Sequence, residues 1–184
     1  MNQEDRERWN KKYTEGFEAE KDPSDLLINF LHLAKKGKAL DVAAGLGRNS
    51  LFLAENGFFV DAVDISDIAI EKLKSLHPNI NPIHADLKTY RPQKESYELI
   101  INFNFLERSL FPYLKEALKK DGVLIFETFV EGTTSKTNKD YILRKNELLH
   151  SFLSLEVILY QERPVKNSKE ETVYKASLVA IKRC

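Results

Sequence analysis

The chain has 184 residues, which is enough for one α/β domain with a sizeable core and too few for two full domains. Lys plus Arg and Asp plus Glu both number 28, so no global basic field exists to hold a nucleic-acid backbone. The single cysteine is Cys184, which excludes an internal disulfide and a cysteine-built zinc site. We therefore expect one domain over residues 1–184 with no metal and no nucleic-acid partner.

Membrane association is not expected either. Residues 1–8 are polar and charged, and no apolar run approaches the roughly 20 residues that span a bilayer. These features predict a cytoplasmic protein, and they leave its state open between monomer and homodimer.

The first 37 residues carry two helical patterns. Residues 2–13 are charged, and Trp9 and Tyr13 stand four positions apart, the spacing that places two rings on one helix face. Asp22-Pro23-Ser24-Asp25 then predicts a helix start, and the leucine-rich stripe that follows ends around residues 35–37.

From Lys38 onward, short apolar runs alternate with amphipathic stretches. The runs predict strands at 39–42, 58–63, 80–84, 99–103 and 123–129. Helices are predicted at 49–56, 68–76 and 106–119, while the link within 80–99 shows the weakest helical pattern. Alternating strands and helices indicate a parallel sheet, because each crossover needs a covering helix.

The C-terminal part has a different pattern. A polar stretch follows residue 129 as far as 139, and a short helix is predicted at 147–153. Two final apolar runs, 155–161 and 173–181, are joined by the charged segment 162–171, which predicts a β-hairpin with a long, solvated loop. We thus expect a mostly parallel sheet that closes with an antiparallel pair.

A glycine turn follows the first predicted strand. Gly45 and Gly47 let the backbone turn sharply and approach a ligand closely, and the next helix presents free N–H groups. Such a turn is equally typical of a simple helix cap, so the following acids matter more. Asp64 ends the second strand, 17 positions after Gly47, where its carboxylate can accept hydrogen bonds from both ribose hydroxyls. The alternative role of Asp64 is to cap the helix that begins near Ser66.

Two more strand ends carry polar side chains. Asp86 ends the third strand and can accept a hydrogen bond from an adenine amino group, and Asn104 follows the fourth strand. Because the carboxyl ends of parallel strands meet at one edge of the sheet, these residues predict a nucleoside-binding rim there.

At this point the sequence resembles the class I S-adenosylmethionine-dependent methyltransferases, and within them the small tellurite-resistance-type branch. The motifs that carry the resemblance are WNKKY at 9–13, GRNSL at 47–51, AVDIS at 62–66, FLER at 105–108, ETF at 127–129 and ELL at 147–149. The resemblance implies a Rossmann-like fold with a seven-stranded sheet and helices on both faces. Residues 1–37 would cover the cofactor site, and residues 38–184 would form the sheet core.

The resemblance also implies the cofactor, S-adenosylmethionine, with S-adenosylhomocysteine as the product. The implied cofactor-binding residues are Trp9, Tyr13, Asp41, Ala43, Gly45, Gly47, Arg48, Asp64, Ile65, Asp86, Leu87, Asn102 and Asn104. Arg48 could instead be a solvated surface residue, and Trp9 with Tyr13 could instead be a helix packing edge. Ala43 stands where the usual pattern has its first glycine, so a positive φ at Ala43 would strain the loop.

Catalysis needs few specific side chains, because the sulfonium methyl group is already electrophilic and the protein need only align a nucleophile with it. Arg108, Glu127 and Arg144 are the candidates near the acceptor, and each could equally be a surface charge. We expect a small-molecule acceptor, such as a thiol or a chalcogen oxyanion.

Three other functions stay open. A nucleic-acid methyltransferase is disfavoured because residues 102–105 contain no proline. A nicotinamide oxidoreductase is disfavoured because Ser50 occupies the third glycine position of that fingerprint. The third alternative is a cofactor-binding module that has lost catalysis.

Overall fold

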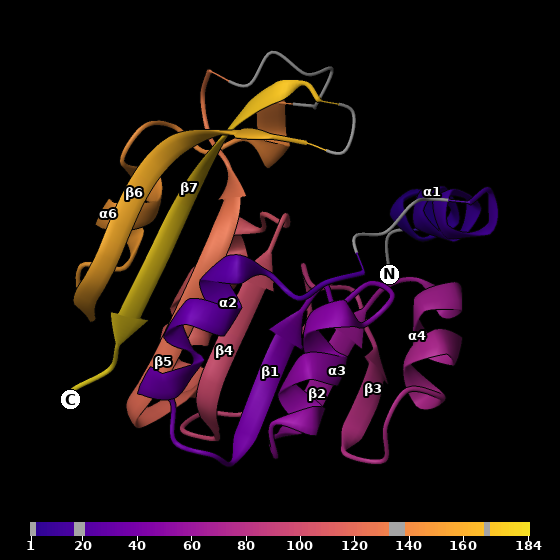
Figure 1. Cartoon of the computed structure of the whole chain (residues 1–184), viewed down its shortest axis with the longest axis horizontal. Helices are drawn as coiled ribbons and strands as arrows, with labels where there is room; N and C mark the ends of the chain where they lie inside the picture. Colours follow the sequence, from indigo (N-terminus) through magenta and orange to yellow (C-terminus); the bar gives the residue numbers. More distant parts are fainter. Residues whose placement is uncertain (1–2, 17–20, 133–138, 168–169) are drawn as a thin grey trace.

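The computed structural model describes residues 3–16, 21–132, 139–167 and 170–184. Within these residues, seven strands form one sheet in the order β3-β2-β1-β4-β5-β7-β6 (Figure 1). They are β1 Lys38–Val42, β2 Phe59–Asp64, β3 Ile80–His84, β4 Tyr97–Phe103, β5 Leu118–Phe129, β6 Glu156–Lys166 and β7 Thr172–Ile181. The first five pair in parallel, whereas β7 is antiparallel to both β5 and β6. The predicted sheet, with its antiparallel C-terminal hairpin, is confirmed.

Helices cover both faces of this sheet, as predicted. The α-helices are α1 Gln3–Thr14, α2 Asp25–Phe30, α3 Arg48–Glu55, α4 Asp67–Lys74, α5 Phe111–Ala117 and α6 Glu147–Ser151. Single 3-10 turns occur at η1 Leu31–Leu33, η2 Arg108–Leu110 and η3 Lys139–Tyr141. Buried residues of α2, α3 and α4 pack on one face of the sheet, and those of α5 and α6 pack on the other.

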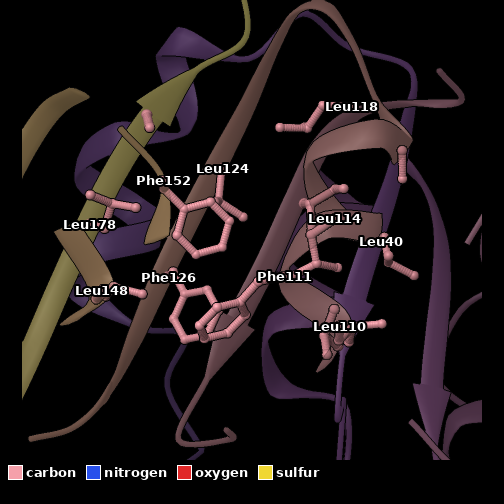
Figure 2. Close-up of a cluster of buried hydrophobic side chains, with 14 of the residues drawn as sticks. Leu40, Leu110, Phe111, Leu114, Leu118, Leu124, Phe126, Leu148, Phe152 and Leu178 are labelled. Atoms are coloured by element: carbon pink, nitrogen blue, oxygen red, sulfur yellow. The ribbon is translucent and has the colours of Figure 1, made fainter. Parts of the chain in front are cut away.

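An aromatic cluster fills the core on the α5 and α6 side (Figure 2). The ring centroids of Phe111 and Phe126 are 5.6 Å apart and nearly perpendicular, and Phe152 lies 5.1 Å from Phe111 and 5.9 Å from Phe126. The ring of Phe152 is fully buried. These three rings join α5, β5 and the end of α6 into one packed unit.

The structure differs from the sequence-based expectations in three segments. The helix predicted to reach residue 119 ends at Ala117, because Leu118 already pairs with Tyr97 and begins a longer β5. The link at 85–96 contains no helix; its turn forms where the N–H groups of Thr89 and Tyr90 donate to the Asp86 carbonyl, and Pro92 lacks an N–H for a helix.

The third correction concerns the C-terminal hairpin. The segment predicted as a long solvated loop is strand as far as Lys166, since Glu162 pairs with Ala176 and Lys166 pairs with Thr172. Charged side chains fit there because β6 is the edge strand, where exposed positions tolerate and even favour charge. Residues 168–169 of the predicted loop lie outside the described residues.

The aromatic cluster leads to a stability prediction. Phe152→Ala should lower the free energy of unfolding by about 3–5 kcal/mol, because it opens a cavity among rings that cannot close over it. Leu153→Ala is the matched control: Leu153 is 60% exposed, and its truncation should cost no more than about 0.5 kcal/mol. Urea unfolding followed by circular dichroism measures both values, and equal losses would contradict this description of the core.

Candidate functional site

A cavity of about 1390 Å³ lies at the carboxyl ends of β1, β2 and β4, bordered by α1. The predicted cofactor residues that line it are Trp9, Tyr13, Asp41, Ala43, Gly45, Gly47, Arg48, Asp64, Ile65, Asp86, Leu87 and Asn104. Asn102 is the exception: its side chain is buried, and its Nδ2 donates to the Phe105 carbonyl at 2.8 Å. Asn102 thus fixes the turn after β4, and the other predicted residues are brought together around one space.

Asp64 is the polar centre of this cavity. Its carboxylate is only 6% exposed, with Oδ2 accepting from the N–H of Gly45 at 2.8 Å and Oδ1 accepting from the N–H of Ser66 at 2.9 Å. Burial raises the pKa of Asp64 above its usual range, although backbone hydrogen bonds from Ser66, Gly45 and Ile65 oppose the rise. The side chain therefore links the loop after β1 to the loop after β2.

The glycine loop is strained at the position where the sequence departs from the family pattern. Ala43 has a φ of +57°, which confirms the expected strain, and a left-handed residue with a Cβ costs roughly 1–2 kcal/mol. Gly45 has a φ of +56°, and a Cβ there would lie 2.9 Å from the Tyr13 hydroxyl. A side chain at Gly45 would therefore both strain the turn and collide with α1.

Asp41 lies below this loop, near the end of β1. It is buried, and its Oδ2 accepts from the Ser50 hydroxyl on α3 at 2.6 Å. Burial raises the pKa of Asp41 to about 7, and the hydrogen bond from Ser50 offsets only part of that rise. The carboxyl group therefore changes charge near neutral pH.

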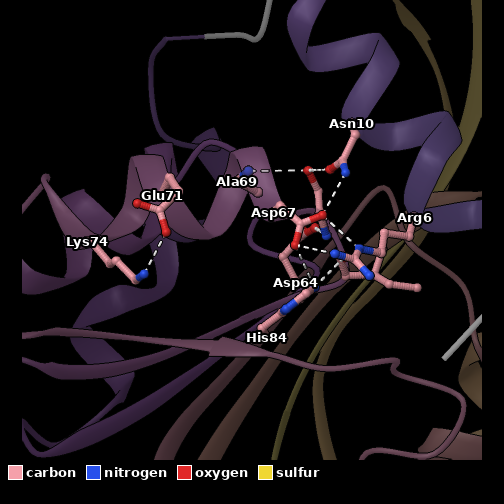
Figure 3. Close-up of polar contacts among 10 residues, drawn as sticks. Arg6, Asn10, Asp64, Asp67, Ala69, Glu71, Lys74 and His84 are labelled. Carbon is pink, nitrogen blue, oxygen red and sulfur yellow. Dashed lines mark hydrogen bonds and ion pairs between the residues drawn. The ribbon is translucent and has the colours of Figure 1, made fainter. Parts of the chain in front are cut away.

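Helix α1 borders the cavity and contributes Trp9 and Tyr13, whose ring centroids are 5.5 Å apart. Its attachment is polar (Figure 3): Arg6 Nε and Nη2 each donate to Asp67 at 2.7 Å, and Asn10 contacts Asp67 and Ser66. The Arg6 guanidinium holds the pKa of Asp67 well below its usual range. Burial raises the pKa of Tyr13, and the nearby Asp64 carboxylate adds to the effect.

Part of the cavity lining was not among the predicted site residues. Phe105, Phe129 and Tyr141 line the cavity, together with Arg8, whose guanidinium carbon lies 5.7 Å from the centre of the Tyr141 ring. Phe105 and Phe129 could have been found, because both stand at the carboxyl ends of strands. Tyr141 had no comparable signal, since it reaches the cavity through η3, after the polar stretch.

Comparisons with known proteins agree with this arrangement. The family model for the tellurite resistance protein TehB matches residues 3–163. The chain belongs to the TehB family. This membership, with the fold, confirms the resemblance to the class I methyltransferases.

Individual relatives have low sequence identity to this chain. The chain is 29% identical to malonyl-[acyl-carrier protein] O-methyltransferase 1 of Ilyobacter polytropus over 152 residues, which are 77% of this chain and 56% of that protein. The crystal structure of TehB from Haemophilus influenzae superimposes with a TM-score of 0.76 at 19% identity, covering 95% of this chain and 67% of that one. The Burkholderia thailandensis 1,6-didemethyltoxoflavin-N1-methyltransferase gives a TM-score of 0.71 at 15% identity, covering 97% of this chain and 87% of that one. The chain spans about half the length of the curated relatives it matches.

Other predicted residues lie apart from the main cavity of this TehB-family chain. Arg108 donates to both carboxylate oxygens of Glu147, at 2.5 and 3.0 Å, and to the carbonyls of Asp140 and Ile142, each at 3.0 Å. It borders a smaller cavity of about 180 Å³. Because each guanidinium nitrogen already has a protein acceptor, Arg108 braces the segment that carries Tyr141.

Glu127 and Arg144 do not line the main cavity either. Glu127 is buried and accepts from the Ser177 hydroxyl at 2.7 Å and from Lys175 Nζ at 3.2 Å. The N–H of Arg144 donates to Glu147 Oε2 at 2.8 Å. A catalytic role for Arg108, Glu127 or Arg144 stays a prediction.

Among the described residues, no helix is long and apolar enough to cross a membrane.

The raised pKa of Asp41 predicts how stability depends on pH. The pKa of this acid is near 4 in the unfolded chain and about 7 in the folded protein, so the folded state binds its proton more tightly. The resulting stabilisation is complete below pH 4 and is lost as the pH rises to about 7. Asp41→Asn keeps a neutral side chain at every pH. Relative to this variant, the unaltered protein should therefore lose up to about 4 kcal/mol of stability between pH 4 and 8.

Urea unfolding across this pH range measures the difference, without added ligand. A constant gap between the two proteins would contradict the raised pKa. Asp121→Asn serves as the control, because Asp121 lies outside this cavity and pairs at the other end of the sheet with Arg183.

Proposed function

We propose that the protein is an S-adenosylmethionine-dependent methyltransferase that acts on a small-molecule acceptor. The observation that carries this proposal is Asp64: a buried carboxylate at the end of β2, held by two backbone N–H groups beside a glycine turn. A diol-binding carboxylate in this place is the usual ribose contact of nucleoside-binding α/β folds.

The residues present suit the cofactor. The Asp64 carboxylate accepts backbone hydrogen bonds from Gly45, Ser66 and Ile65 and lines the cavity, where its remaining acceptor capacity could take a ribose hydroxyl. The cavity volume of about 1390 Å³ exceeds the roughly 300–1,000 Å³ of ordinary ligand pockets, which leaves room for cofactor and acceptor together. Two structural neighbours have S-adenosylhomocysteine bound: one is in complex with 1,6-didemethyltoxoflavin as well, and the other with phosphomonomethylethanolamine.

Several side chains are assigned roles by this proposal. Asp64 and Ile65 would hold the ribose, Asp86 and Leu87 would flank the adenine, and the glycine loop with Trp9 and Tyr13 would surround the methionine part. When bound, S-adenosylmethionine supplies an electrophilic methyl group. The chain's own part is to align a nucleophile with that group and to exclude water from it.

For the acceptor, we propose a small anion or soft nucleophile, such as a thiol or a chalcogen oxyanion. Several cationic side chains, among them Arg8, Lys12 and Lys88, line the same cavity as the aromatic rings, and Arg8 and Lys88 both pair with Asp5. Rings and cations together favour a polarisable anion over a neutral polar compound. We further propose that residues 1–184 act as one domain in the cytoplasm, as a monomer or homodimer.

Cofactor binding tests the assignment of Asp64. Asp64→Asn should weaken S-adenosylhomocysteine binding by roughly 10- to 100-fold, because the amide places a donor toward backbone N–H groups and removes the charge that strengthens the ribose bonds. Asp121→Asn, which makes the same chemical change outside the cavity, should bind like the unaltered protein. Isothermal titration calorimetry measures all three, and binding of NADH in place of S-adenosylhomocysteine would overturn the proposal.

Methyl transfer tests the acceptor class. With S-adenosylmethionine labelled in its methyl group, we expect labelled product from tellurite, selenite or a small thiol, detected by mass spectrometry of the solution and the headspace. Transfer only to an oligonucleotide would show a nucleic-acid methyltransferase. Tight cofactor binding with no transfer to any acceptor in the panel would favour a binding module without catalysis.

A further inference from the structure

Helix α1 is attached in a way that bears directly on Asp64. Its residues are at most half-buried, and polar contacts join it to the start of α4. Asn10 makes two of these contacts: its Nδ2 donates to Asp67 Oδ2 at 2.7 Å, and its Oδ1 accepts from the Ser66 hydroxyl at 2.7 Å. Figure 3 shows Asn10 reaching from α1 to the start of α4.

The chemistry of the partners fixes the orientation of the Asn10 amide. The Asp67 carboxylate can only accept, so it faces the amide NH₂ group. The Ser66 hydroxyl accepts from the N–H of Ala69 at 3.2 Å, so its proton is available for the amide oxygen. An asparagine is therefore the side chain that satisfies both neighbours at once.

Ser66 connects this contact to the cofactor site. Its own N–H donates to Oδ1 of Asp64 at 2.9 Å, so a hydrogen-bonded path runs from Asn10 through Ser66 to Asp64. The hydroxyl that contacts Asn10 and the N–H that contacts Asp64 belong to one residue. Movement of Ser66 would change both bonds.

The same helix reaches the other oxygen of Asp64. Tyr13 lies three positions after Asn10, on the same face of α1. Its hydroxyl is 2.9 Å from the place where a Cβ on Gly45 would be, and the Gly45 N–H donates to Oδ2 of Asp64 at 2.8 Å. Helix α1 therefore contacts both of the loops that hold the carboxylate.

We propose that Asn10 is a positioning residue for the ribose carboxylate, which couples the docking of α1 to the placement of Asp64. The inference rests on the proposed function, because it takes Asp64 as the ribose contact. When α1 docks, Ser66 and Gly45 are fixed on either side of Asp64, and Trp9 and Tyr13 come to border the cavity. One event thus orders the ribose end and the methionine end together.

The coupling can be separated from simple closure of the cavity by comparing two ligands. One is S-adenosylhomocysteine, and the other is its 2′,3′-dideoxy analogue, which lacks the hydroxyls that Asp64 would bind. Asn10→Ala should weaken S-adenosylhomocysteine by roughly tenfold, the size expected for losing one to two net hydrogen bonds. The analogue should lose only about threefold, through the methionine end that α1 also borders, because it lacks the hydroxyls that Asp64 would bind. Calorimetry of both ligands gives the ratio.

Two further variants sharpen the comparison. Asn10→Asp places a second carboxylate against Asp67 and should weaken S-adenosylhomocysteine more than Asn10→Ala does. Lys11→Ala is the matched control, because Lys11 is exposed and forms its ion pair with the exposed Glu15, four positions along the chain. It should bind both ligands like the unaltered protein. Since α1 buries no residue, these changes leave the core intact.

The fluorescence of Trp9, the only tryptophan in the sequence, reports whether α1 is docked. Its emission should shift to longer wavelength in unliganded Asn10→Ala and stay unchanged in Lys11→Ala. Equal losses of affinity for both ligands would overturn the inference and leave the proposed function standing, because Asn10 would then only fasten the helix. Absence of S-adenosylhomocysteine binding by the unaltered protein would overturn the proposed function and this inference with it.

Discussion

The carboxylate of Asp64 is the interaction on which the site depends. A charge that is almost fully buried is costly unless hydrogen bonds compensate it, and here the N–H groups of Gly45 and Ser66 do so. Those two donors come from the loops after β1 and β2. The need to satisfy one side chain therefore fixes the shape of both loops around the proposed ribose contact.

The floor of the proposed cofactor site and the helix that covers it are supported differently. The floor lies on buried strands and on α3 and α4, which pack in the core. Helix α1 lies over it with no buried residue, held by Arg6 and Asn10 through Asp67 and Ser66. A polar attachment of this kind can open without disturbing the core, and it suits an element that must admit and release a ligand as large as a nucleoside.

The sequence predicted the features that are local. The apolar runs of β1 to β4, the glycine turn and Asp64 fall within short stretches whose period or composition is distinctive, and the strain at Ala43 follows from one missing glycine. Features that depend on distant partners were not predictable. The charged end of β6 is a strand only because β7 pairs with it, and the pairing of Arg108 with Glu147 joins residues 39 positions apart.

The same distinction explains why the cofactor is easier to infer than the acceptor. Much of the proposed cofactor contact comes from one β-α-β unit between Asp41 and Ile65, where backbone N–H groups and two carboxylates do the binding. The proposed acceptor contacts, Arg8, Phe105 and Tyr141, are far apart in the chain. Substitutions at these positions can change the shape and charge of the space without moving Asp64. A family built this way can keep one methyl donor while its members diverge in the compounds they methylate.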